Sequence, residues 1–165
     1  MRIYTDASSR GAVSGIAFVV TDARDRELYK KGIVIEEPDN NTAELCAILY
    51  ALQEVQYVEV KHVTIFTDSW YAINAVRNNV KRKKDKHIVK EIRRHMDEIN
   101  SSLMWIKGHY KSGTVLSYYN KRADKMSKVV RRKYEKQIKQ ERKVQKQQMR
   151  AIRASIPAGA TFESQ

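Results

Sequence analysis

Four carboxylates lie at the ends of apolar runs or within amphipathic stretches of the sequence. Asp6 follows an apolar run in IYTDAS, and Asp68 ends the run VTIFTD. Glu44 begins an amphipathic stretch, and Asp124 lies in another, NKRADKMS. Carboxylates that converge repel one another and raise each other's pKa, a cost that a divalent cation removes. Because all the ligands are oxygens, the expected ion is a hard cation such as Mg²⁺ or Mn²⁺.

The overall charge indicates what such a metal pocket would act on. The 165 residues carry a net charge of +13, and the pI is about 9.8, which favours a polyanionic partner. An acidic metal pocket in a basic protein suggests phosphodiester chemistry. Two ions about 4 Å apart can hold both the attacking and the leaving oxygen of an in-line displacement.

Each carboxylate also has a purely structural interpretation. Asp6 can be a turn aspartate, and Asp68 can be the N-cap of the next helix. Glu44 can close a capping box with Asn41 as the N-cap. Asp124 can complement a helix N-terminus. Each of these is the commoner interpretation for one acid alone, and only the set of four favours a metal site.

The hydrophobic pattern predicts the elements that would position these acids. Apolar and alternating runs predict strands over 2–7, 13–21, 28–35, 63–67 and 102–108. Helical periodicity predicts helices over 42–57, 69–79, 87–99 and from about Tyr119 onward. Three strands with short connections indicate an antiparallel meander, and the later strand–helix–strand crossover indicates parallel neighbours. We therefore predict an α/β fold, a mixed five-stranded sheet flanked by helices, with ligands at the carboxyl ends of its strands.

Five motifs follow one another over about residues 1–130: IYTDAS, NNTAELCAILYAL, VTIFTDSWYAI, WIKGH and YNKRADKMS. In these motifs and in their order the chain resembles type 1 ribonuclease H. The resemblance implies the ribonuclease H-like fold, with sheet order 3-2-1-4-5. It also implies an endonuclease that hydrolyses the RNA strand of RNA–DNA hybrids with two Mg²⁺ ions, for which Mn²⁺ can substitute. The expected products carry 5′-phosphate and 3′-hydroxyl ends.

The resemblance assigns roles to individual residues. Asp6 would bridge the two ions, Asp68 would ligate the ion that activates water, and Asp124 would ligate the ion near the leaving oxygen. Glu44 would complete the metal shell and sense the attacked ribose, and His109 would assist proton transfer and product release. The expected substrate-binding residues are Ser8, Asn40, Asn41, Trp70, Lys81, Arg82, Lys83, Lys84 and Asn120.

Several of these residues have other interpretations or depart from the family pattern. His109 can be an ordinary surface histidine, and Asn120 can cap the last helix. Trp70 stands where the family has glutamine, and we expect it to be partly buried. A separate basic handle helix is missing from the sequence, so Lys81–Lys84 and the basic C-terminus are expected to take over part of its function.

The expected domains are a catalytic domain over 1–134 and a basic helical extension with a disordered end over 135–165. Residues 125–165 hold 12 Lys and Arg against 3 Asp and Glu, a net charge of +9. This segment is either a solubilising helix or tail, or a phosphate-contacting element whose binding weakens with salt.

Two other functions stay open on sequence grounds. The first is a module of the same fold that binds RNA–DNA hybrid or other nucleic acid without cleaving it. The second is another metal-dependent nuclease or strand-transfer enzyme of the superfamily, for which additional domains would be needed. We expect a cytoplasmic monomer without a membrane segment, because there is one cysteine, Cys46, no signal peptide pattern and no long apolar run.

Overall fold

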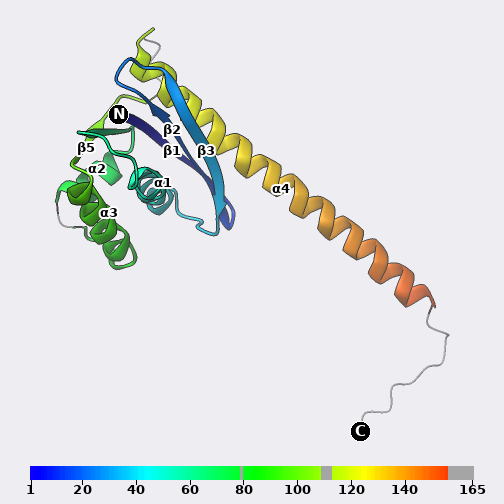
Figure 1. The fold of residues 1–165 in the computed structure, drawn as a ribbon. Coiled ribbons are helices and arrows are strands. Elements are labelled where there is room, and N and C mark those ends of the chain that lie inside the picture. The colour runs from blue at the N-terminus through cyan, green and yellow to red at the C-terminus, as the bar shows by residue number, and fades with distance from the viewer. Residues whose placement is uncertain (79, 109–112, 156–165) are drawn as a thin grey trace. The chain divides into compact units, whose positions relative to one another are not determined.

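The computed structural model describes residues 1–78, 80–108 and 113–155 (Figure 1). Its elements are, in order, β1 (Arg2–Arg10), β2 (Val13–Thr21), β3 (Glu27–Ile35), α1 (Asn40–Val55), β4 (Val63–Thr67), α2 (Trp70–Arg77), a 3₁₀ turn (Lys83–Asp85), α3 (Lys86–Glu98), β5 (Ser101–Trp105) and α4 (Val115–Ser155). The five strands form one mixed sheet in the order β3-β2-β1-β4-β5. The predicted α/β class and the strand order implied by the resemblance are confirmed.

The strand register determines which acids can meet. β1 pairs antiparallel with β2 and parallel with β4, and Tyr4 lies opposite Phe66. Two residues further on, the same register brings Asp6 level with Asp68, just where β4 has ended. β1 itself continues to Arg10, beyond the predicted end at residue 7, because it pairs with β2 along its whole length. Asp6 is therefore a mid-strand residue beside the end of a neighbouring strand.

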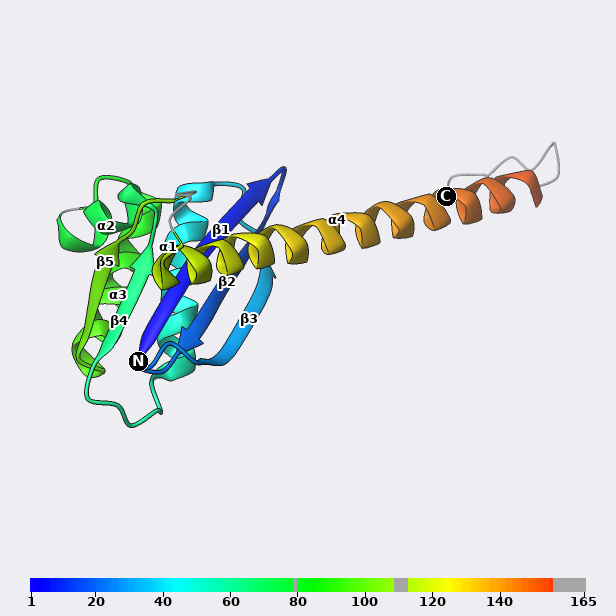
Figure 2. The same ribbon diagram turned by 90° about the horizontal axis from the view of Figure 1, so that it is seen from above.

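The sheet buries a hydrophobic core on each face. The larger core lies under α1, α2 and α3, and the smaller one joins the sheet to the first part of α4 (Figures 1 and 2). Tyr4 belongs to the smaller core, where it stacks on Phe66 at 5.1 Å and on Tyr119 at 5.2 Å between ring centroids. Alternate residues of a strand share a face. Asp6 and Asp68 therefore follow Tyr4 and Phe66 onto the face that α4 covers.

A glycine lets α4 approach the sheet closely. A Cβ atom placed on Gly15 in β2 would lie 2.1 Å from the carbonyl oxygen of Ser127, which leaves room for no side chain there. The close approach positions Ser127 and the neighbouring Asp124 beside β1. Because Gly15 has no side chain, α4 can come close enough to the sheet to bring Asp124 near Asp6.

The helices differ from the predicted ones mainly at their ends. α4 begins at Val115 instead of near Tyr119, and the short turn at Lys83–Asp85 was not predicted. By its internal contacts the chain forms two compact units, residues 1–131 and residues 132–165. No helix within the described ranges has an apolar stretch that could cross a bilayer.

Candidate active site

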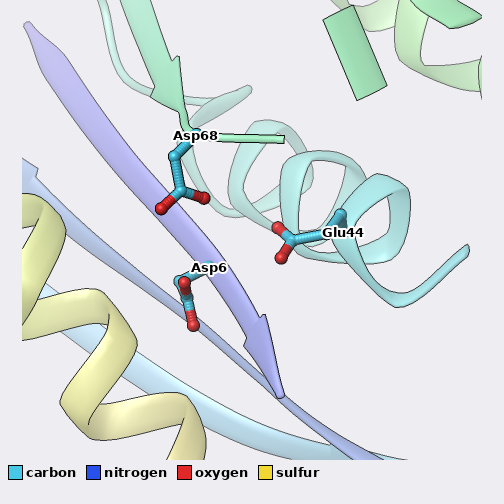
Figure 3. Close-up of side chains that lie close together, drawn as sticks. All are labelled: Asp6, Glu44 and Asp68. Atoms are coloured by element: carbon cyan, nitrogen blue, oxygen red, sulfur yellow. The ribbon is translucent and has the colours of Figure 1, made fainter. Parts of the chain in front are cut away.

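Three of the four acids meet at one point. Asp6, Glu44 and Asp68 each offer a carboxylate oxygen, and these oxygens all lie within 4.8 Å of one another. Figure 3 shows that they come from the middle of β1, from α1 and from the residue after β4, with their side chains directed toward one another. Asp6 and Glu44 are buried, and Asp68 is partly exposed. The predicted convergence is confirmed for these three residues.

The capping interpretations of Glu44 and Asp68 are wrong. The N-cap of α1 is Asp39, whose Oδ1 accepts a hydrogen bond of 2.9 Å from the amide of Thr42. The proposed cap, Asn41, already lies inside the helix. The N-cap of α2 is Ser69, whose hydroxyl accepts from the amide of Ala72 at 3.2 Å. Because other residues satisfy both helix ends, the two carboxylates are left for the cluster.

The fourth acid lies near the cluster but is held differently. Asp124 is nine residues past the start of α4, so it is too far along the helix to interact with the N-terminal dipole. Its carboxylate forms an ion pair with Lys128, one turn later. It is close enough to Asp6 to raise the pKa of that residue. Asp124 therefore lies near Asp6, but it is not one of the three acids that converge.

Burial and mutual repulsion make the cluster hard to ionise. Burial, followed by the charges of Asp124 and Asp68, raises the pKa of Asp6 to about 7, although a hydrogen bond from Ser127 opposes the shift. The pKa of Glu44 is raised well above its ordinary value by burial and by the charges of Asp6 and Asp68. Such a pocket is costly when it holds only negative charge and is stabilised by a bound cation.

Two buried oxygens are suited to receive that cation. Among the described residues, Oε2 of Glu44 and Oδ1 of Asn120 have no hydrogen-bond donor. The amide nitrogen of Asn120 donates to Oδ2 of Asp68 at 3.2 Å, so its free oxygen lies next to the cluster. Buried acceptors without a donor are rare in proteins. The donor set, all oxygen and mostly carboxylate, fits a hard divalent cation.

Two supporting residues escaped the sequence analysis. Ser127 is fully buried and donates a hydrogen bond of 2.5 Å from its hydroxyl to Oδ2 of Asp6. Gly108 packs against Asp68 so closely that an added Cβ would lie 2.3 Å from Oδ2. The Gly in WIKGH was noted only as part of a motif, and nothing in the local pattern around Ser127 distinguishes it from a core serine.

Some of the predicted substrate-binding residues are exposed, and others are buried or bind other side chains of the protein. Asn40 and Asn41 are exposed at the start of α1, and the Asn40 side chain accepts from the amide of Ser9 at 3.1 Å and donates to Glu44. Ser8 instead accepts a hydrogen bond of 3.1 Å from Arg131 within the protein. Asn120 is buried beside Asp68. Because α4 begins five residues before it, Asn120 does not cap this helix. His109 lies outside the described residues.

Trp70 differs from the expectation of partial burial. It is 56% exposed and stacks by one face on Trp105, with 4.8 Å between ring centroids and an angle of 16°. Trp70 is the first residue of α2, and Trp105 donates from Nε1 to the carbonyl oxygen of Asp68 at 3.1 Å. Trp70 is therefore linked to the acidic cluster through Trp105, which contacts the backbone of Asp68.

Two cations of the basic stretch before α3 form ion pairs within the protein. Arg82 binds Asp39 at 2.8 Å and holds the pKa of that carboxyl well below its usual range, and Lys84 binds Glu37 at 3.1 Å. Both cations keep part of their side chain exposed, and the assignment of all four cations to substrate binding stays a prediction. Lys81 and Lys83 are exposed.

A buried aspartate holds this stretch against α1. Asp85 has no exposed surface and accepts hydrogen bonds from Thr42 at 2.7 Å and from the hydroxyl of Tyr71, with Arg82 at 3.4 Å. Thr42 lies two residues before Glu44, so the network fixes the turn of α1 that carries this acid.

Comparisons with known proteins agree with the fold. A sequence model of the RNase H family matches residues 1–132. One similar structure is LC11-RNase H1, isolated from compost by a metagenomic approach and solved in complex with an RNA/DNA hybrid. It is 26% identical with a TM-score of 0.64, covering 76% of this chain and 91% of that one. A search of curated proteins found no match.

Two more distant structures are similar in fold alone. The RNase H1 of the halophilic archaeon Halobacterium salinarum is 17% identical with a TM-score of 0.66, and the alignment covers 77% of this chain and 93% of that one. The N-terminal RNase H domain of a Mycobacterium tuberculosis protein is 18% identical with a TM-score of 0.63, covering 77% and 91%.

Proposed function

The chain belongs to the RNase H family, and on this premise we propose that it is an endonuclease that hydrolyses the RNA strand of RNA–DNA hybrids. The proposed products carry 5′-phosphate and 3′-hydroxyl ends. The observation that carries the proposal is the convergence of Asp6, Glu44 and Asp68 within 4.8 Å, in a pocket where burial raises the pKa of Asp6 and of Glu44. A pocket that served only the stability of the fold would not gather three acids without a cationic side chain among them.

Asp6, Glu44 and Asp68 would hold the divalent ions, with Asp124 as a further ligand once Lys128 releases it. Two Mg²⁺ ions are proposed, and Mn²⁺ can replace them. Bound divalent ions supply Lewis acidity to the attacking water and to the leaving oxygen. Ser127 and Asn120 keep Asp6 and Asp68 in place through the hydrogen bonds that they donate.

Residues around the cluster would position the hybrid without reading its sequence. Asn40 and Asn41 lie exposed beside Glu44, where an amide can meet a sugar hydroxyl. The 2′-hydroxyl distinguishes RNA from DNA at each nucleotide, whereas phosphate contacts only set the register. The exposed face of Trp70 offers a flat surface on which a sugar or base can pack. His109, which follows Gly108 in the sequence, is proposed to assist proton transfer.

The test is cleavage of an end-labelled RNA–DNA hybrid in Mg²⁺ and in Mn²⁺, with RNA and DNA duplexes of the same sequence as controls. We expect internal cuts in the RNA strand of the hybrid alone, with 5′-phosphate on the downstream fragment. Asp68→Asn should reduce the rate by several orders of magnitude while it preserves the fold. If folded wild-type protein binds the hybrid but cuts it in neither metal, the chain is a binding module and the proposal is wrong.

A further inference from the structure

The second compact unit carries its positive charge in a regular pattern. α4 continues without interruption to Ser155, and its part beyond residue 131 holds nine Lys and Arg against two Glu. Seven of the nine cations recur at alternating intervals of four and three residues, and they are Arg132, Lys136, Lys139, Lys143, Lys146, Arg150 and Arg153. An α-helix turns about 100° per residue, so this spacing places all seven on one face. We call these seven residues the basic stripe.

The other faces of this segment differ from the basic stripe. The side opposite it carries the apolar residues Tyr134, Ile138, Met149 and Ile152, but Glu141, Gln145 and Gln148 interrupt them. Every described residue from Lys139 to Ala154 is exposed. A helix that lies on a membrane needs a continuous apolar face, and this helix lacks one. Between residues 132 and 155, the basic stripe is the one face on which side chains of the same kind, all positively charged, recur along the whole length.

Like charges three and four residues apart repel one another on a helix. The basic stripe repeats this unfavourable arrangement from Arg132 to Arg153, so a polyanion bound along it would relieve the repulsion. Those 21 residue steps span about 32 Å at about 1.5 Å per residue, which is close to one turn of a nucleic-acid duplex. The length and the sign of the charge both fit the backbone of a duplex.

We propose that the basic stripe binds the phosphate backbone of a nucleic-acid duplex, at a site separate from the acidic cluster. This contact goes beyond the proposed cleavage, because it needs neither a metal nor a 2′-hydroxyl. It recognises phosphates, so it holds DNA duplexes and RNA–DNA hybrids alike. Its affinity falls steeply with salt, since each neutralised phosphate releases a counterion.

The test uses the full-length chain and a fluorescent DNA duplex about two helical turns long, which is not a substrate for the proposed cleavage. Binding is measured by anisotropy over a series of KCl concentrations. The stripe variant is Lys139→Gln/Lys143→Gln, which keeps good helix formers in place. We expect the slope of log K against log salt to become shallower by about 1.8, and the affinity near 0.15 M salt to fall roughly 10- to 30-fold.

A matched control separates geometry from net charge. It combines the two stripe substitutions with Gln145→Lys and Gln148→Lys, which restore the net charge on the opposite face. We expect this variant to bind as weakly as the stripe variant. Unchanged binding in the stripe variant, or full recovery in the control, overturns the proposal. So does binding to vesicles of phosphatidylcholine and phosphatidylserine in place of the duplex.

These outcomes are independent of the proposed function. Failure to cleave hybrid leaves the anisotropy result intact, and loss of the stripe contact leaves the acidic cluster intact. Circular dichroism of each variant shows whether the helix is retained.

Discussion

The hydroxyl of Ser127 donates a hydrogen bond of 2.5 Å to Oδ2 of Asp6, and so joins α4 to the middle of β1. Because this bond lowers the pKa of Asp6, its removal in Ser127→Ala should raise that pKa further. The acid limb of the pH–rate profile of cleavage should then shift to higher pH, with a loss of rate near pH 6 and little change near pH 9. Ser102→Ala, which removes only a surface contact to His62, serves as the control. Identical pH profiles for both variants would contradict the assignment.

The pKa of Asp6 also predicts how the metal-free protein responds to pH. The pKa is about 7 in the folded protein against 3.8 for an ordinary aspartate, so the folded state binds the proton more tightly than the unfolded state does. Stability should therefore fall as pH rises from about 4 to about 7, and the loss should be complete above that range. In EDTA at pH 8, Asp6→Asn should raise the free energy of unfolding by on the order of 2–4 kcal/mol.

Urea denaturation at pH 8 and at pH 4 measures this effect. The gain from Asp6→Asn should disappear at pH 4, and Mg²⁺ should reduce it at pH 8 by stabilising the wild type. Glu59→Gln, at an exposed acid, should change neither value. A destabilised Asp6→Asn protein in EDTA at pH 8 would show that the acid is not under electrostatic strain.

Gly108 leaves the space that the carboxylate of Asp68 occupies. In Gly108→Ala the new methyl group would lie 2.3 Å from Oδ2, so the carboxylate must rotate away from Asp6 and Glu44. We expect cleavage and metal affinity to fall by about 10- to 100-fold, with the melting temperature nearly unchanged. Gly113→Ala is the matched control, because a Cβ there would meet no atom of the described residues within 4 Å. Equal rates for the two variants would argue against the close contact.

Asp85 should be a strong determinant of stability. It is fully buried and binds Thr42, Tyr71 and Arg82, so Asp85→Ala removes a buried acceptor from three polar groups at once. The free energy of unfolding should fall by roughly 2–4 kcal/mol. The same substitution at the exposed Asp97 should cost far less, and chemical denaturation of both variants measures the difference. A small effect at Asp85 would mean that water replaces its contacts.

The periodic signals of strands, helices and crossovers were sufficient to predict a mixed five-stranded sheet flanked by helices, whereas the strand order was implied by the family resemblance. Four acids were predicted to meet, and three of them, Asp6, Glu44 and Asp68, do. The sequence could not show that Asp39 and Ser69 are the helix caps, since several polar residues near each helix start are chemically capable of capping. That choice depends on the backbone geometry at each helix start.

Contacts between residues far apart in the chain were also beyond the sequence. Arg82 and Lys84 are predicted to bind substrate, but their ion pairs with Asp39 and Glu37, which lie more than 40 residues earlier, could not be predicted. Ser127 reaches Asp6 across 121 residues. No local pattern encodes such pairs, because each side chain is ordinary in its own segment and gains its function only from the fold.

The most direct test of the account is a crystal structure of the protein with Mn²⁺, with diffraction data collected at the manganese absorption edge. The account predicts anomalous peaks in contact with the carboxylates of Asp6, Asp68 and Glu44. Crystals of Asp68→Asn should lose at least one of these peaks. If Mn²⁺ at concentrations that support cleavage gives no peak at these acids, or binds only elsewhere on the protein, the acidic cluster is not the metal site and the account is contradicted.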